Sequence, residues 1–213
     1  MKHLVVIAAF AVAALAAHGE LFSFSAITAN DMNGCAQSTG ESQLYMDVTS
    51  LGTGQASLVF TNAGPEASAI SGIYFDFIPE LSLSLATINN GYGVDFQTSP
   101  VKPKNLPGGQ DLDPVFICDL RVGAKGPGPL KGINPYESLE LIMNYDASYD
   151  LLSALGSEYL RVGLHAQSFS GGYSESFINV LSDPHGIPEP GTIPLLLAGS
   201  LILRRLQIGR SRG

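Results

Sequence analysis

Apolar side chains recur at every second position in several stretches between Leu44 and Val180, and this alternation restricts the fold more than any other feature of the sequence. A period of two is typical of β-strands that bury one face, because successive side chains point to opposite sides of a strand. The pattern predicts about nine strands. Their approximate positions are residues 44–48, 56–61, 73–77, 81–85, 94–96, 115–122, 139–145, 160–166 and 176–180.

Turn-forming residues separate these stretches. The 213 residues include 24 glycines and 13 prolines, and only 14% are charged, which favours many turns over long surface helices. The sequence therefore predicts an all-β fold, an antiparallel two-sheet β-sandwich of jelly-roll type. One short helix is predicted over residues 149–155, capped by Ser148 and ended by Gly156. The Pro- and Gly-rich spans 102–113 and 123–135 are predicted to be surface loops.

The first residues have the composition of a secretory signal peptide. Lys2 precedes an apolar run from Leu4 to Leu15. As a helix this run is about 18 Å long, well below the ~30 Å of a bilayer core. Small residues follow at a spacing that signal peptidase accepts, so we expect cleavage between Ala16 and Glu20. We therefore expect a signal helix in residues 1–19 and export of the rest; the alternative is an uncleaved membrane anchor.

The last residues contain a short motif, an apolar stretch and a basic pair. The motif is Pro188-Glu189-Pro190, the apolar stretch is residues 193–203, and Arg204 and Arg205 follow. The stretch covers about 16 Å as a helix, which suits temporary retention in a membrane better than a permanent span. The arginines are expected to stay in the cytoplasm and the motif outside.

This order of features resembles the PEP-CTERM sorting signal of Gram-negative bacteria, which is recognised by exosortase, a membrane protease or transpeptidase. The resemblance implies that the Pro-Glu-Pro motif is the sorting motif and that the two arginines hold the chain in the inner membrane until processing. Pro194 inside the apolar stretch and the eight residues after Arg205 depart mildly from the pattern. The alternative is a conventional anchor that is never processed.

The body of the chain also resembles a recurrent secreted domain that precedes this signal in PEP-CTERM proteins. The likeness lies in residues 58–77, 105–109, 132–141 and 160–179. It implies an extracellular β-sandwich. The two terminal signals set the expected bounds: an exported domain over residues 20–184, and a linker with the sorting signal in 185–213. The expected location is the cell surface or the extracellular matrix of exopolysaccharide and biofilm, with signal peptidase and exosortase as processing partners.

The charge of the body excludes one class of partner. Between Glu20 and Ile187 there are 18 acidic and 6 basic residues, a charge of −12. Such a surface repels phosphate backbones, and it has no basic stripe. The sequence therefore indicates that nucleic acid is not a partner.

Catalytic chemistry is not expected from this sequence. His165 lies on the polar phase of its strand and is predicted to face solvent or to bond a loop, while His185 lies in the linker. Asp76 and Glu140 could serve a hydrolase only if each opposed another acid across a cleft; as exposed strand residues they are interpreted as solubilising. We therefore expect a non-enzymatic structural or adhesive module.

Carbohydrate binding is the alternative function. Aromatic side chains can stack on sugar rings, and although the chain has no Trp, several tyrosines are available. They are Tyr92, Tyr136, Tyr149 and Tyr173.

Two further hypotheses concern cysteine and calcium. Cys35 and Cys118 are the only cysteines, and export would permit a disulfide between them; Cys118 could equally be a buried thiol. Asp111 and Asp113 beside two glycines could lend oxygens to a structural Ca²⁺ ion, although an ordinary acidic loop is favoured. No other cofactor is expected.

Overall fold

The computed structural model describes residues 19–52, 54–98 and 103–181, and alternating apolar residues form ten strands in these ranges. The strands are β1 (Gly19–Ala26), β2 (Leu44–Gly52), β3 (Gln55–Asn62), β4 (Ala69–Phe77), β5 (Ser84–Asn90), β6 (Phe96–Gln97), β7 (Leu120–Ala124), β8 (Ser138–Asn144), β9 (Leu160–Gln167) and β10 (Glu175–Leu181). The helices are α1 (Cys35–Gln43), α2 (Gly128–Lys131) and α3 (Leu151–Leu155), with 3₁₀ turns η1 (Pro79–Leu81) and η2 (Gly109–Asp111).

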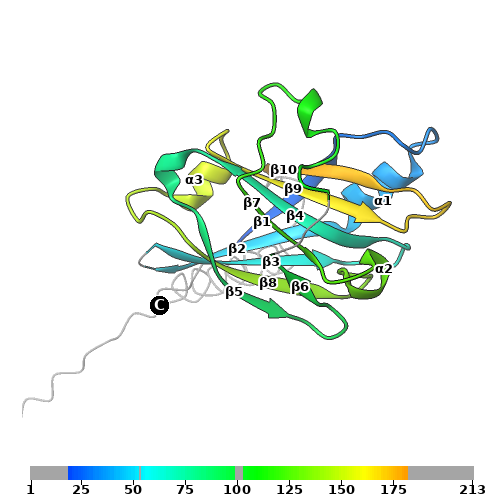
Figure 1. Cartoon of the computed structure of the whole chain (residues 1–213), viewed down its shortest axis with the longest axis horizontal. Helices are drawn as coiled ribbons and strands as arrows, with labels where there is room; N and C mark the ends of the chain where they lie inside the picture. The colour runs from blue at the N-terminus through cyan, green and yellow to red at the C-terminus, as the bar shows by residue number, and fades with distance from the viewer. Residues whose placement is uncertain (1–18, 53, 99–102, 182–213) are drawn as a thin grey trace, which may run out of the picture. The chain divides into compact units, whose positions relative to one another are not determined.

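All ten strands belong to one antiparallel sheet, in the order β5-β8-β3-β2-β1-β10-β9-β4-β7-β6. Strand β1 hydrogen-bonds to both β2 and β10 and so joins two halves of the sheet. Figure 1 shows these halves as two layers, one with β4, β9 and β10 and the other with β2, β3 and β8. The antiparallel β class is confirmed, and what the sequence predicts as two sheets are the two halves of one.

The sheet nearly closes into a barrel, because its two edge strands, β5 and β6, contact each other. The side chain of Asn90 makes the connection. Its Oδ1 accepts a hydrogen bond from the Phe96 N–H at 2.7 Å, and its Nδ2 donates to the Phe96 carbonyl at 3.4 Å. One amide side chain thus replaces a backbone pair between the edges.

Apolar residues from both halves fill the space between the layers. Phe60 of β3 and Phe75 of β4 meet edge to face, with ring centroids 6.5 Å apart and an interplanar angle of 83°. Both are fully buried. Their contact across the interior shows that the two halves share one core.

Residues 103–119, the loop before β7, cover part of the outer face of β4 and β9, so both faces of these strands carry buried side chains. Leu106 and Phe116 of this loop form a second apolar cluster with Tyr74. Leu106 packs against Gly163, where an added Cβ would lie 2.5 Å from its Cδ2. Leu106 belongs to the predicted surface loop 102–113, so this loop also has a buried side.

The predicted short helix is confirmed as α3, but with a different N-cap. Asp150, not Ser148, precedes it, and its carboxylate accepts a hydrogen bond from the Ser153 N–H at 2.9 Å. Gly156 ends the helix as predicted. The Ser148 N–H instead donates to Asp146 Oδ1 at 2.8 Å, so that residue belongs to the preceding turn.

Strand β1 and helix α1 are absent from the sequence predictions. In β1 the alternation is short, with only Phe22 and Phe24 fully turned to the core. Helix α1 has a polar sequence of small residues without a helical apolar period, so the sequence pattern does not indicate a helix there. It lies against β1 and β10, and Gly40 touches the ring of Phe177.

Both ends of the described domain lie at one end of the sheet. Phe22 of β1 pairs with Leu181 of β10, and Gly19 pairs with Thr49 near the β2–β3 turn. We call this region the Gly19 end; it includes the start of β1, the end of β10, the β2–β3 turn and residues 145–156. No helix among the described residues is long and apolar enough to cross a membrane. The predicted signal helix and C-terminal helix lie outside the described residues, apart from Gly19.

Candidate functional site

A cleft of about 390 Å³ opens at the Gly19 end, between the ends of β2, β3 and β8 and helix α3. Its floor is apolar, because the lining residues Val48, Ala56 and Leu151 are between 1% and 4% exposed. Ser50 continues the inward phase of β2 after Val48, yet it is exposed. The change from apolar to polar along this inward phase marks the point where the core ends and the cleft begins.

Two tyrosines line the cleft. Tyr145 follows β8 in the inward phase of that strand, and Tyr149 lies in the turn before α3. Both are half-buried and pack against the main core. Tyr149 is one of the predicted sugar-stacking tyrosines, whereas Tyr145 and Ser50 were not identified from the sequence, where they are only the continuations of strand patterns.

The loop that carries the tyrosines is fixed by backbone hydrogen bonds. The Tyr145 N–H donates to the Gly54 carbonyl at 2.8 Å, the Asp146 N–H donates to the Leu81 carbonyl at 2.9 Å, and the Tyr149 N–H donates to the Asp146 carbonyl at 3.0 Å. Gly54 has φ +73°, and an added Cβ would lie 2.5 Å from the Tyr145 carbonyl oxygen. Glycine at this position lets the β2–β3 turn approach the cleft wall closely.

The other predicted tyrosines do not reach the cleft. Tyr92, Tyr136 and Tyr173 lie in loops at the opposite end of the sheet and are 99%, 75% and 37% exposed. The aromatic pairs among the described residues are formed by phenylalanines in the core. The tyrosines that the structure brings together are therefore Tyr145 and Tyr149.

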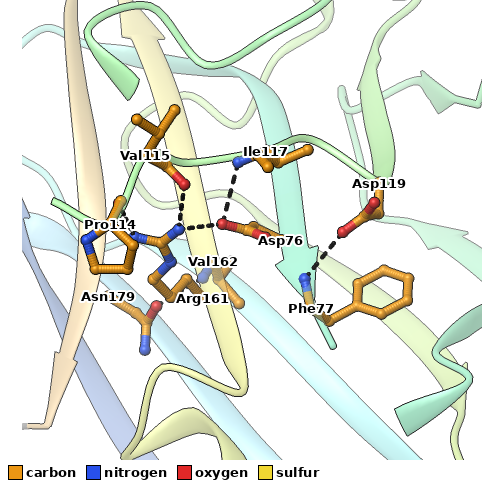
Figure 2. A network of polar contacts seen from close by, with 9 residues as sticks. All are labelled: Asp76, Phe77, Pro114, Val115, Ile117, Asp119, Arg161, Val162 and Asn179. Atoms are coloured by element: carbon orange, nitrogen blue, oxygen red, sulfur yellow. Dashed lines mark hydrogen bonds and ion pairs between the residues drawn. The ribbon is translucent and has the colours of Figure 1, made fainter. Parts of the chain in front are cut away.

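Asp76, one of the two candidate catalytic carboxylates, is part of a polar network on the outside of β4 and β9 (Figure 2). Its Oδ2 forms an ion pair with Arg161 and accepts a hydrogen bond from the Ile117 N–H at 3.1 Å. Arg161 also donates to the carbonyl oxygens of Pro114 and Val115 at 2.6 and 2.7 Å. These contacts hold the covering loop on the sheet.

Glu140, the other candidate carboxylate, is bound by neighbouring strands. It accepts hydrogen bonds from the Ser57 hydroxyl at 2.6 Å and the Asn89 amide at 2.7 Å, and these bonds lower the pKa of Glu140. It lies on the outer face of β8, and Asp76 lies on the outer face of the other half of the sheet. The two carboxylates do not face each other across the cleft.

His165 is buried, with 8% exposure, so of its two predicted environments the solvent-facing one is wrong. Its ring lies between polar side chains of β9 and β10, and its Nε2 is 3.2 Å from the Gln167 amide nitrogen. Its Nδ1 lies 3.5 Å from the Ser176 hydroxyl. Burial lowers the pKa of His165, and the neighbouring Glu175 partly opposes that shift.

Glu175 is fully buried beside this histidine and ties the segment after β1 to β10. Its carboxylate accepts hydrogen bonds from the N–H groups of Asn30 and Asp31, both at 2.8 Å, and from the Thr28 hydroxyl at 2.5 Å. Several donors to one buried carboxylate compensate for its lost hydration. We interpret the contact as structural.

Both cysteines are free thiols in this structure. Cys35 begins α1 and is exposed, whereas Cys118 is half-buried beside the second apolar cluster, where burial raises its pKa. The alternative of a buried thiol at Cys118 thus agrees with its surroundings more closely than the disulfide does.

The calcium hypothesis gains no support. Asp111 accepts a hydrogen bond from the Gln110 amide at 3.0 Å, and both Asp111 and Asp113 are exposed. The described part of the chain contains no group of three or more His, Cys, Asp or Glu residues that could hold a metal ion.

The predicted sorting residues lie outside the described residues. They are Pro188, Glu189, Pro190, Arg204 and Arg205. Comparison of the chain with family models, curated proteins and solved structures finds no match.

Proposed function

We propose that this chain is an exported protein of the cell surface or the extracellular polysaccharide matrix. Signal peptidase removes its N-terminal leader, and the C-terminal tail retains it in the inner membrane until an exosortase-type enzyme cleaves near the Pro-Glu-Pro motif. The β-domain is the part delivered to the outside, where it acts as a structural or adhesive module.

The observation that carries the proposal is the position of the two domain ends. Gly19 starts β1 and Leu181 ends β10, and the pairing of Phe22 with Leu181 makes these strand ends neighbours. A leader before Gly19 and a tail after Leu181 are therefore both attached at the Gly19 end. Cleavage near Glu20 and near residue 188 would leave the core residues of β1 and all of β10 in the mature domain.

Intact mass spectrometry of the protein from its native host tests this proposal, with an exosortase-null strain for comparison. The expected product begins near Glu20 and ends between Pro188 and Gly191, and the null strain accumulates a longer C-terminus. The variant Glu189→Gln should resemble the null strain. Glu80→Gln is a matched control, because Glu80 also follows a proline but lies inside the folded domain.

An intact C-terminus in both strains would overturn the sorting proposal. Equal processing of the wild-type chain and the Glu189→Gln variant would show that the Pro-Glu-Pro motif does not direct cleavage. A mature N-terminus that still contains residues 1–15 would contradict removal of the leader.

A further inference from the structure

The aromatic lining of the cleft suits a flat ligand with an apolar face. Tyr145 and Tyr149 are each half-buried by contact with the core, and both residues line the cleft. A tyrosine that is already packed loses little conformational freedom when a ligand stacks on it. The C–H face of a pyranose ring is such a partner, and the apolar floor at Val48 and Ala56 extends the contact surface.

Hydroxyl and carboxylate groups stand beside these rings. Ser50, Ser148 and Asp150 line the same cleft, and all three are exposed. One oxygen of Asp150 accepts the hydrogen bond from the Ser153 N–H that caps α3. The second oxygen has no partner among the described residues, so it can accept a hydrogen bond from a ligand hydroxyl.

The charge of the cleft selects against anions. Asp150 lines it, whereas no lysine or arginine of the described chain does. The body around it carries a formal charge of −12 between Glu20 and Ile187. A uronate, phosphate or sulfate group would meet like charge without a compensating cation, whereas a neutral polyol would not.

The cleft also requires little rearrangement. Its volume of about 390 Å³ falls within the roughly 300–1,000 Å³ of small-molecule sites. The backbone bonds from Tyr145 to Gly54 and from Tyr149 to Asp146 already fix the wall. From these observations we propose that the cleft binds a neutral pyranose unit of a glycan, with the two tyrosines as stacking surfaces and Asp150 and the two serines as hydrogen-bonding groups. This site is independent of how the tail is processed.

Calorimetric titration of the purified full chain, in a detergent without a sugar headgroup, tests the proposal. The probes are neutral glucose and mannose oligosaccharides and a uronic acid oligosaccharide of equal length. We expect at least one neutral probe to bind saturably and at least tenfold more tightly than the uronate. Tyr149→Ala should weaken that binding at least tenfold.

Three further variants keep the test decisive. Tyr159→Ala removes a tyrosine that is 53% exposed and does not line the cleft, so it should change affinity less than twofold. Ser50→Tyr places a large side chain in the cleft from an exposed position without removing a core contact. It should abolish binding while leaving the melting temperature unchanged. Asp150→Asn keeps a helix cap and should reduce the preference for neutral over uronate probes at least threefold.

The proposal is overturned if no neutral probe saturates the wild-type chain, or if the uronate binds as tightly as the neutral probes. It is also overturned if Ser50→Tyr binds as well as wild type, or if Tyr159→Ala loses as much affinity as Tyr149→Ala.

Discussion

Arg161 of β9 forms an ion pair with Asp76 of β4, and the same two side chains bind the loop that crosses the outside of these strands. Arg161 donates to the Pro114 and Val115 carbonyls, and Asp76 accepts from the Ile117 N–H. Backbone groups that would pair with a neighbouring strand are thus satisfied by side chains. The ion pair therefore links β4, β9 and the loop before β7 in one polar network.

Replacement of Asp76 by Asn is expected to lower the free energy of unfolding by about 3 kcal/mol, because it leaves the guanidinium of Arg161 buried without a counter-charge. The side chains of Arg161 and Asp76 are 13% and 15% exposed, so water solvates the remaining charge of Arg161 only weakly. Urea denaturation measures the change. Asp119→Asn is a matched control, since Asp119 accepts one bond from the Phe77 N–H, and it should cost less than about 1 kcal/mol. Equal losses in the two variants would contradict this role for the ion pair.

Gly40 is expected to be required for the packing of α1. Alanine in a helix interior is favoured over glycine by about 1 kcal/mol. Here its Cβ would lie 2.1 Å from the Cζ atom of the fully buried Phe177, and overpacking typically costs about 1–3 kcal/mol. Gly40→Ala should therefore lower the melting temperature, and adding Phe177→Leu should recover part of the loss. A higher melting temperature for Gly40→Ala alone would contradict this prediction, because it would show that α1 or Phe177 shifts enough to accept the added Cβ.

The sequence predicted strands well where one face meets the core. Leu44, Met46 and Val48 alternate in β2 as predicted, and all three are buried. The prediction failed where apolar residues serve another purpose. Residues 115–119 do not continue β7, because Arg161 and Asp76 bind their backbone and Phe116 packs on the outside of the sheet.

Residues 81–85 show a second kind of failure. Leu81 and Leu83 are buried, as their alternation suggests, but Pro79 starts a 3₁₀ turn and Ser82 adopts φ +50°, so the strand begins only at Ser84. Local backbone constraints outweigh the apolar period at this point.

The cleft could not be predicted, because it depends on long-range pairing. Ser50 and Tyr145 are distant in sequence, and the pairing of β2 with β3 and of β3 with β8 brings their strand ends together. In the sequence, Ser50 and Tyr145 are only the positions that follow the last buried residues of two alternating stretches. Only the register of three strands shows that they border the same space.

Acidification is expected to destabilise the fold through His165. Its folded-state pKa is lowered, mainly by burial, so the unfolded chain binds a proton more readily. The stability contributed by neutral His165 is therefore present above the unfolded value of about 6.5 and is lost as the pH falls below it. His165→Gln should flatten the dependence of the unfolding free energy on pH between about 5 and 7. An unchanged slope in that variant would assign the acid sensitivity to other groups.

The two thiols are expected to differ in reactivity. Cys35 is exposed, whereas Cys118 is half-buried, its Sγ lies 3.5 Å from the Leu120 carbonyl oxygen, and burial raises its pKa. Because the thiolate is the reactive form, a thiol reagent at pH 8 should modify Cys35 at least tenfold faster than Cys118 in the folded chain. Cys35→Ser should remove the fast phase and Cys118→Ser the slow one. If the exported protein instead shows no thiol until it is reduced, Cys35 and Cys118 are bonded, and α1 must approach the loop before β7 more closely than it does in this structure.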